Sequence, residues 1–265
     1  MKGEEMKAVD LDKHMRQVGT WVNWESTTDH FLLGDPETEV KGAAVVWQGR
    51  TSALQEAVEM GCNLIITHEQ VFYPESHVSR EGETQPYETE KRKLVEERGL
   101  VVYRCHDVWD QMPEVGIVDS WGAHLALGKA IAHGNVEAVY ASPKPTLLEL
   151  AKYVAGKTKD LRQDSVEMVG DAQAKVSKVA IGCGAGVNMH KMVDELGADV
   201  VIGTDDGMSY WAQGSWALDR GIPLVVVNHC VSEEPGMKNL AKYIGEKFGI
   251  KSVHIPQGSL YTTVG

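Results

Sequence analysis

The 265-residue sequence lacks several features that would assign it to a familiar class of protein. It has no apolar run close to the ~18 residues that a membrane-spanning helix requires, so we expect no membrane partner. Residues 1–7 are charged and have no apolar core, which argues against a secretory signal peptide. These absences predict a cytoplasmic protein.

Cysteine and positive charge are also scarce. The cysteines form no CxxC pair, so we expect them to be reduced and mostly buried. Acidic residues outnumber Lys and Arg by 38 to 26, and the net charge is −12. Because a nucleic-acid surface needs a positive field over the phosphates, we expect no nucleic-acid partner. The four cysteines are Cys62, Cys105, Cys183 and Cys230.

What the sequence does contain is a repeated alternation of strand and helix patterns. In the first half, these predict strands at 40–47, 63–67 and 100–104, and helices at 51–60 and 87–98. In the second half, they predict strands at 176–181, 200–202 and 224–227, and helices at 189–196, 210–219 and 235–248. This order predicts an α/β protein with two similar lobes, each a mostly parallel or mixed sheet flanked by helices.

The lobes are expected at residues 1–130, including an N-terminal helix, and at residues 131–265. The polar stretch 157–175 is a candidate connection between them. The glycine-rich turn at 182–186 follows a predicted strand, but it lacks the GxxxxGK[ST] lysine and the GxGxxG spacing. We therefore interpret it as a tight turn rather than as a phosphate site.

Histidines and acids follow three of the predicted strands. Ligands of open parallel sheets bind beyond the carboxyl ends of the strands, and imidazole and carboxylate are common metal ligands. Two of the three clusters have a histidine and an acid four residues apart, which places both on one face of a helical turn. The residues concerned are His68 and Glu69, His106 and Asp110, and His229 and Glu233.

Each cluster alone has a simpler interpretation. A histidine near a strand end often donates to a backbone carbonyl, and an acid there often caps the next helix. Three clusters are harder to explain in this way, because carboxylates gathered in one place repel unless a cation neutralises them. We therefore favour a metal site, in the cleft between the two lobes. Asp205 and Asp206, which end another predicted strand, are open candidates to line the same cleft.

Several segments carry a resemblance to a known family. They are Thr-Asp-His-Phe-Leu-Leu-Gly at 28–34, Leu-Ile-Ile-Thr-His at 64–68, the His106 and Asp110 pair, residues 197–206, and the His229 and Glu233 pair before Gly236. With these motifs the chain resembles the NIF-three-like family, also labelled GTP cyclohydrolase I type 2-like. The resemblance covers nearly the whole chain.

The resemblance implies a dinuclear metal centre. By position, the implied metal ligands are His68, His106, Asp110, His229 and Glu233. The implied cofactors are divalent ions, two per chain, of Zn, Fe or Mn, and the implied assembly is a homo-oligomer, a hexamer.

Three positions depart from the family pattern. Glu69 stands where the family has a second histidine, so it is either a ligand that favours harder ions such as Mn or Fe, or a catalytic base. Gln70 stands in place of a proline, and Asn228 in place of a glycine. The chain therefore looks like a divergent member.

These observations predict a metal-dependent hydrolase that acts on a small molecule through a metal-activated water. The bond cleaved would be an amide, a cyclic amidine or a heterocyclic ring C–N bond. The alternative is a non-catalytic metal-binding protein with a regulatory or assembly role. An enzyme needs an open coordination position and an ordered pocket, whereas a binding protein needs neither. The loops at 71–86 and 111–120 are expected to determine specificity.

Overall fold

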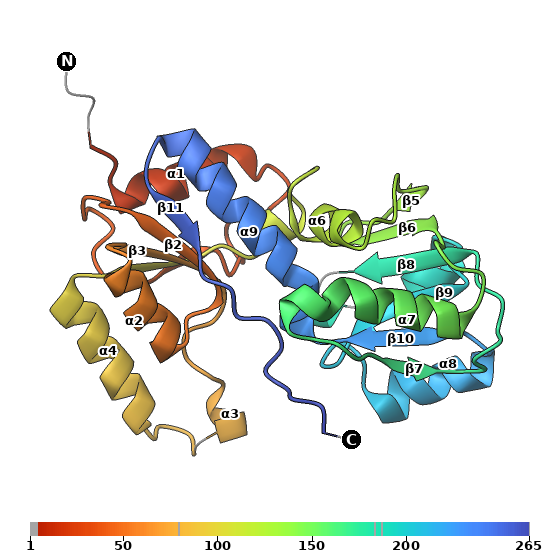
Figure 1. Ribbon diagram of the computed structural model, residues 1–265. Coiled ribbons are helices and arrows are strands. Elements are labelled where there is room, and N and C mark those ends of the chain that lie inside the picture. The colour runs from red at the N-terminus through yellow and green to blue at the C-terminus, as the bar shows by residue number, and fades with distance from the viewer. Residues whose placement is uncertain (1–4, 79, 183, 187, 265) are drawn as a thin grey trace. The chain divides into compact units, whose positions relative to one another are not determined.

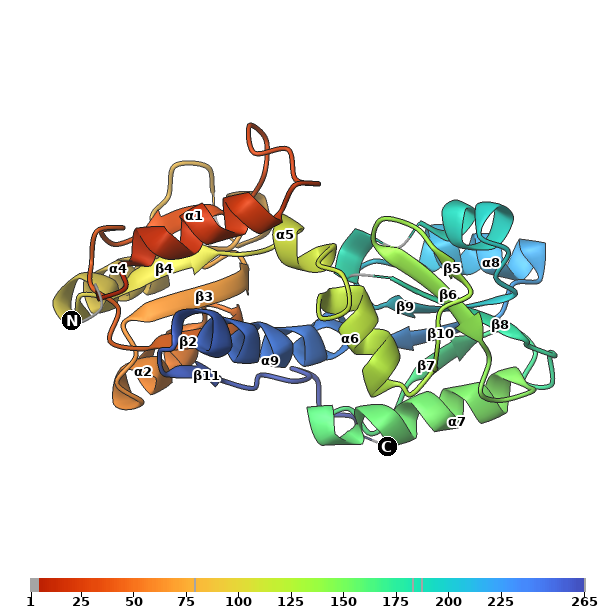
Figure 2. The same cartoon turned by 90° about the horizontal axis from the view of Figure 1, so that it is seen from above.

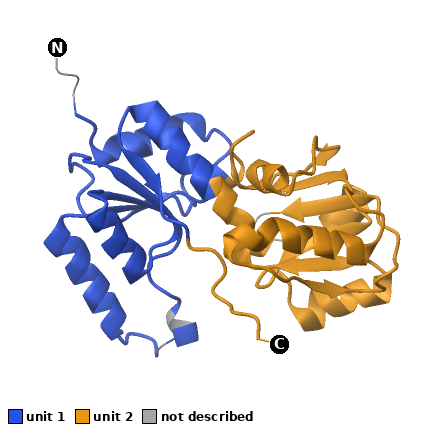
Figure 3. Cartoon of the chain, viewed as in Figure 1, with its two compact units in different colours: residues 1–109, 237–256 blue, residues 110–236, 257–265 orange. Residues whose placement is uncertain are grey.

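The computed structural model describes residues 5–78, 80–182, 184–186 and 188–264. The chain forms two compact units (Figure 3). Unit 1 consists of Met1–Trp109 and Met237–Pro256, and unit 2 consists of Asp110–Gly236 and Gln257–Gly265. Each unit contains one mixed sheet flanked by helices, which confirms the predicted fold class (Figure 1).

Unit 1 is built on a five-stranded sheet with the order β1-β4-β3-β2-β11. Strands β2, β3, β4 and β11 are parallel, and β1 is antiparallel to β4. The strands are β1 (His30–Leu33), β2 (Ala43–Gln48), β3 (Leu64–Glu69), β4 (Val101–Arg104) and β11 (Ser252–His254). The helices are α1 (Ala8–Val18), α2 (Thr51–Glu59), α3 (Glu75–Val78), α4 (Pro86–Arg98) and α5 (Asp107–Asp110).

Both faces of this sheet are covered by helices. Four consecutive residues of β2, from Ala43 to Val46, are fully buried, as expected for a central parallel strand. Helices α2 and α4 cover one face, and α1 and the second half of α9 cover the other (Figures 1 and 2). Helix α4 ends at Gly99, whose φ of +58° suits glycine, as the sequence predicts.

Unit 2 is built on a six-stranded sheet with the order β5-β6-β8-β9-β10-β7. Strands β8, β9 and β10 are parallel, and the other pairs are antiparallel. The strands are β5 (Ala132–His133), β6 (Glu137–Ala141), β7 (Glu167–Val169), β8 (Lys178–Gly182), β9 (Val200–Thr204) and β10 (Leu224–Val227). The α-helices are α6 (Ile117–His124), α7 (Leu147–Thr158), α8 (Ser215–Arg220) and α9 (His229–Phe248).

Shorter helical segments complete unit 2. They are η1 (Lys159–Leu161), η2 (Gly184–Gly186), η3 (Lys191–Glu195) and η4 (Tyr210–Gly214). Helices α6 and α7 pack on one face of the sheet, and η3 and α8 pack on the other. The predicted helices at 189–196 and 210–219 are present, but each contains a π-helical segment, η3 in the first and η4 in the second.

The division of the chain differs from the expected boundary at residue 130, which lies inside unit 2. The chain passes from unit 1 to unit 2 within α5, and it returns within α9, between Gly236 and Met237. The stretch 157–175, expected to connect the lobes, instead holds η1 and β7 and belongs to unit 2. Because β7 is a short edge strand with mostly exposed side chains, it has no apolar run that identifies it.

Helix α9 begins earlier than the sequence predicts. The predicted start is Pro235, because proline is favoured in the first turn of a helix. In the structure the helix begins at His229 and contains Pro235. His229 and Glu233 therefore share one turn of a regular helix.

The predictions about cysteines and membrane spans can be compared with the structure for the described residues only. Cys62, Cys105 and Cys230 are free and buried, whereas Cys183 lies outside the described residues. None of the helices in the described part of the chain has the length and apolarity needed to cross a membrane.

A buried lysine joins α4 to the segment after β3. The side chain of Lys91 is almost fully buried, and its Nζ donates to the carbonyl of Val71 at 2.6 Å. The ammonium lies over the rings of Tyr73 and Tyr87, at 4.9 and 5.4 Å from their centroids. Burial lowers the pKa of Lys91 from 10.5 to about 8.

This pKa predicts how stability depends on pH. Between about pH 8 and 10.5 the unfolded chain binds more protons at Lys91 than the folded chain does. The free energy of unfolding should therefore rise with pH through this window. We expect Lys91→Met to remove that part of the rise, which amounts to at most about 3 kcal/mol.

Urea unfolding at several pH values from below 8 to above 10 measures the effect. The matched control is Lys93→Met, because Lys93 lies in the same helix but is exposed. A pH profile of Lys91→Met that coincides with those of the wild type and the control would contradict the prediction.

Candidate metal centre

The register of the unit 1 sheet brings two histidines together. Thr67 of β3 pairs with Arg104, the last residue of β4, so His68, near the end of β3, lies close to His106, which follows β4. The rings of His68 and His106 stack with centroids 4.4 Å apart. His68, Glu69 and His106 offer ligand atoms that all lie within 4.8 Å of one another.

The hydrogen bonds of these two histidines set which nitrogen is available. His68 Nδ1 donates to the carbonyl of Cys105 at 3.1 Å, and His106 Nδ1 donates to the carboxylate of Asp107 at 2.9 Å. Because both partners only accept hydrogen bonds, Nδ1 carries the hydrogen and Nε2 carries the lone pair in the neutral ring. In a histidine that binds a metal through one ring nitrogen, the other nitrogen typically donates its hydrogen to a carbonyl or a carboxylate.

The segment at 28–34 gains a structural role here. Asp29 is buried, and its carboxylate accepts hydrogen bonds from the backbone N–H groups of His106 and Val108. It therefore caps α5, the helix that follows His106 and carries Asp110. The carboxylate of Asp107 accepts hydrogen bonds from His106, Thr27 and Thr28. These bonds, above all the one from His106, hold the pKa of the Asp107 carboxyl well below its usual range.

Asp110 is the last residue of α5, one helical turn after His106. His106, Asp107 and Asp110 again offer ligand atoms within 4.8 Å of one another. The predicted spacing of four residues thus brings the histidine and the acid to one side of the helix.

Glu69 has a cationic neighbour that the sequence did not indicate. Arg104 Nη2 donates to Glu69 Oε2 at 3.1 Å, and Arg104 Nε donates to the carbonyl of His68 at 2.9 Å. The other carboxylate oxygen, Glu69 Oε1, lies 3.8 Å from His106 Nε2. Arg104 therefore fixes the orientation of Glu69 and offsets its charge, while one oxygen stays on the side of His106.

In unit 2, His229 and Glu233 form a close buried pair on α9. His229 Nε2 lies 3.0 Å from Glu233 Oε1, and His229 Nδ1 donates to Asp206 Oδ2 at 2.8 Å. Burial alone would lower the pKa of His229, but the two carboxylates outweigh it and raise the pKa to about 10. The pair is thus suited to a cation: a divalent ion on Nε2 and Oε1 would replace the proton that they share.

Gly184 lies directly against this pair. A Cβ atom added to Gly184 would collide with His229 Nε2 and Glu233 Oε1. The carbonyl of Gly184 accepts a hydrogen bond of 2.6 Å from Thr204 Oγ1, at the end of β9. The turn at 182–186, interpreted above as a tight turn only, therefore keeps open the space beside two candidate ligand atoms. Residue 183 of this turn lies outside the described residues.

The structure thus places the predicted ligands in two groups. Unit 1 brings together His68, Glu69 and His106, and unit 2 brings together His229 and Glu233. Asp110, the first residue of unit 2, follows His106 by one turn at the end of α5. The supporting residues that the sequence did not identify as such are Asp29, Arg104, Asp107 and Gly184. Only Asp29 had a usable signal, since it belongs to a segment that carries the family resemblance.

The sequence profile of the family described as Duf34/NIF3 (NGG1p interacting factor 3) matches residues 7–258. A curated relative named GTP cyclohydrolase 1 type 2 homolog, from Clostridium perfringens (strain 13 / Type A), is 22% identical over 228 residues, which cover 82% of each chain.

Solved structures show the same fold. A Bacillus cereus protein related to NIF3 matches with a TM-score of 0.78 at 14% identity, over 99% of this chain and 100% of that one. Reduced HcgD from Methanocaldococcus jannaschii matches with a TM-score of 0.73 at 19% identity, over 96% of this chain and 99% of that one.

Fold and residue groups together define an α/β protein of two sheets whose strand ends carry groups able to hold a metal ion. Because the family profile spans nearly the whole sequence, the chain belongs to the Duf34/NIF3 family.

The position of Gly184 leads to a prediction about metal affinity. We expect Gly184→Ala to lower the affinity for divalent ions, because the new methyl group would occupy the space beside His229 and Glu233. Calorimetric titration of the folded variant with Mn²⁺ or Zn²⁺ measures the change.

Two controls separate this effect from backbone strain. Gly197→Ala also introduces a side chain at positive φ, +75°, but nothing lies within 4 Å of the added Cβ. Gly186→Ala changes the same turn and likewise meets open space. Equal losses of affinity in all three variants would contradict the proposed role of Gly184.

Proposed function

We propose that this protein is a metal-dependent hydrolase that acts on an amide, a cyclic amidine or a heterocyclic ring C–N bond of a small molecule. The proposed ligands are His68, His106, Asp110, His229 and Glu233. The observation that carries the proposal is that all three histidines donate Nδ1–H to a carbonyl or a carboxylate, so that Nε2 is the ligand nitrogen. A divalent cation held by these residues would acidify a bound water and polarise the bond to be cleaved.

We propose further that each chain binds two ions, of Zn, Fe or Mn. The family resemblance supports this number.

Glu69 is the proposed proton acceptor. One of its oxygens is held by Arg104, and the other lies beside His106 Nε2. In this arrangement Arg104 is a positioning residue, because it acts only through the carboxylate.

The name of the Clostridium relative supports the type of reaction, since a cyclohydrolase cleaves a ring bond with water. The competing proposal is a metal-binding protein without catalytic activity, with a regulatory or assembly role and a hexameric state, as the resemblance implies. The two proposals differ in whether turnover accompanies metal binding.

The first experiment measures the metal content of the purified protein by elemental mass spectrometry. We expect two first-row ions per wild-type chain. Asp110→Asn and Glu233→Gln should each lower that number, because each removes a charged ligand. Glu246→Gln serves as the control, because Glu246 is an exposed acid on the same helix as Glu233.

Two outcomes would count against the proposal. Full metal content in Asp110→Asn or Glu233→Gln would remove that residue from the ligand set. A wild-type chain without bound metal, even after incubation with Mn²⁺ or Zn²⁺, would overturn the hydrolase and the metal-binding alternative together.

A second experiment tests Glu69 by restoring the histidine of the family pattern. As a proton acceptor that is not a ligand, Glu69 should be replaceable by histidine without a change in the number of bound ions. If Glu69 were a ligand, Glu69→His would shift the preference from Mn towards Zn, because imidazole is the softer ligand. Competition between the two ions measures this shift. One ion in the wild type and two in the variant would mean that Glu69 is not an adequate ligand.

A further inference from the structure

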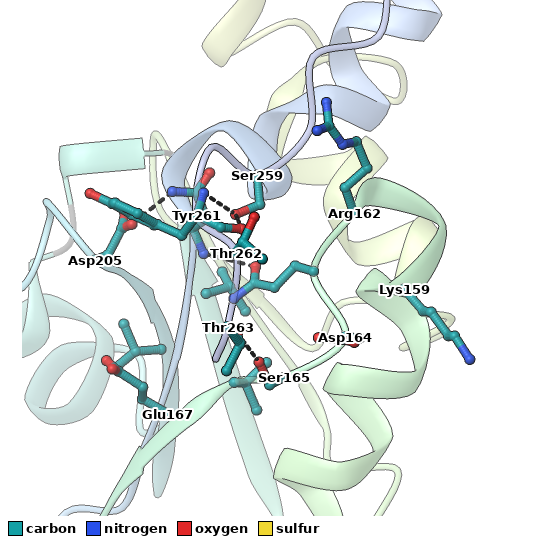
Figure 4. A pocket seen from close by; sticks show the side chains of 15 residues that line it. Lys159, Arg162, Asp164, Ser165, Glu167, Asp205, Ser259, Tyr261, Thr262 and Thr263 are labelled. Carbon is teal, nitrogen blue, oxygen red and sulfur yellow. Dashed lines mark hydrogen bonds between the residues drawn. The ribbon is translucent and has the colours of Figure 1, made fainter. Parts of the chain in front are cut away.

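Unit 2 contains a cavity of about 640 Å³ beside the end of β10. Its walls come from residues 159–167, from the end of β10 and from the tail at 259–263 (Figure 4). Lys159 and Arg162 extend away from the other lining side chains (Figure 4). The rest of the wall combines hydroxyl, amide and carboxylate groups with the apolar side chains of Val166, Val226 and Val227. The volume falls in the range of small-molecule sites. Among the described residues that line it, none is a proposed metal ligand.

The hydrogen bonds of two amides in the wall fix their orientation. Asn228 Nδ2 donates to Asp205 Oδ2 at 2.7 Å, and a carboxylate can only accept, so Oδ1 is the remaining amide atom. Gln163 Oε1 accepts the backbone N–H of Asn228 at 3.0 Å, so Nε2 is its remaining atom. The two neighbouring amides therefore leave one acceptor, Asn228 Oδ1, and one donor, Gln163 Nε2.

The acceptor, Asn228 Oδ1, lacks a hydrogen-bond donor within the described part of the chain. Asn228 Oδ1 is buried, and no group among the described residues donates a hydrogen bond to it. A buried acceptor without a donor destabilises the protein, and such a group in a native protein calls for an explanation. Asn228 lines the cavity, and a ligand N–H group that displaces the atoms covering Oδ1 would provide the missing donor.

We propose that this cavity binds a cyclic amide or ureide, a planar ring with an adjacent N–H and C=O. The N–H group donates to Asn228 Oδ1, and the carbonyl accepts from Gln163 Nε2. The assignment of this ring as the substrate rests on the proposed hydrolase function, whereas the binding site itself does not.

The position of Asn228 also connects the cavity to the proposed metal ligands. Asn228 directly precedes His229, and Asp205 Oδ1 accepts the backbone N–H of His229 at 3.0 Å. The glycine of the family pattern at position 228 has no side-chain acceptor. Asn228 is therefore a specificity-determining residue of this chain.

The test measures binding of uracil and of 1,3-dimethyluracil to the chelated, metal-free protein by NMR titration. Both probes have the same ring, but only uracil has N–H donors. We expect saturable binding of uracil, and binding of 1,3-dimethyluracil that is weaker by about tenfold or more. Equal affinity for the two probes, or no binding of uracil, would overturn the proposal.

Variants then assign the interaction to the two amides. Asn228→Gly and Gln163→Met should each weaken uracil binding by about tenfold, because each removes one hydrogen-bond partner. Lys159→Met, on the same wall but directed away from the cavity, should leave it unchanged (Figure 4). If Asn228→Gly fails to fold, Gln163→Met and the dimethylated probe still decide. Unchanged affinity in a folded Asn228→Gly or Gln163→Met variant would remove that residue from the site.

The same measurements keep the two proposals separate. Uracil binding by a protein that takes up no metal would support the cavity and overturn the hydrolase. Metal uptake by a protein that does not bind uracil would overturn the cavity proposal and leave the hydrolase proposal standing.

Discussion

The hydrogen bond from Nδ1 of each proposed ligand histidine is the interaction on which the candidate centre depends. Its acceptors are the carbonyl of Cys105 and the carboxylates of Asp107 and Asp206. All three follow the carboxyl ends of parallel strands, so the sheet register determines where each acceptor lies. Each imidazole is thereby held in one tautomer and one orientation before any ion is present, which lowers the cost of ordering the ligands on binding.

The two groups of ligands differ in how they balance carboxylate charge. In unit 1, Arg104 offsets the charge of Glu69, and a guanidinium stays protonated at any pH that a folded protein experiences. In unit 2, the proton on His229 offsets the charge of Glu233, and a cation can replace it. Metal binding at the His229 pair must therefore release a proton, whereas the charge of Arg104 remains and opposes a second cation beside Glu69.

Much of the fold could be predicted from the sequence, because β2, β3, β4 and the helices between them have long, regular patterns. The spacing of His106 and Asp110, and of His229 and Glu233, likewise indicated shared helical turns. The rest depends on contacts between distant parts of the chain. The ion pair of Arg104 with Glu69 arises from strand pairing across 35 residues, and the position of Gly184 against α9 follows from the order of the strands. No local pattern contains either contact.

The two oxygens of Asp205 join the proposed metal ligand and the proposed substrate cavity. Oδ1 holds the backbone N–H of His229 at the start of α9, and Oδ2 holds the amide of Asn228. Since one carboxylate anchors both, a shift of α9 that moves His229 must also move the acceptor that Asn228 offers to a ligand. The position of the metal ligand and the shape of the cavity therefore cannot change independently. A substitution at residue 228 is the exception, because it removes the acceptor offered to a ligand while Asp205 still holds the backbone N–H of His229.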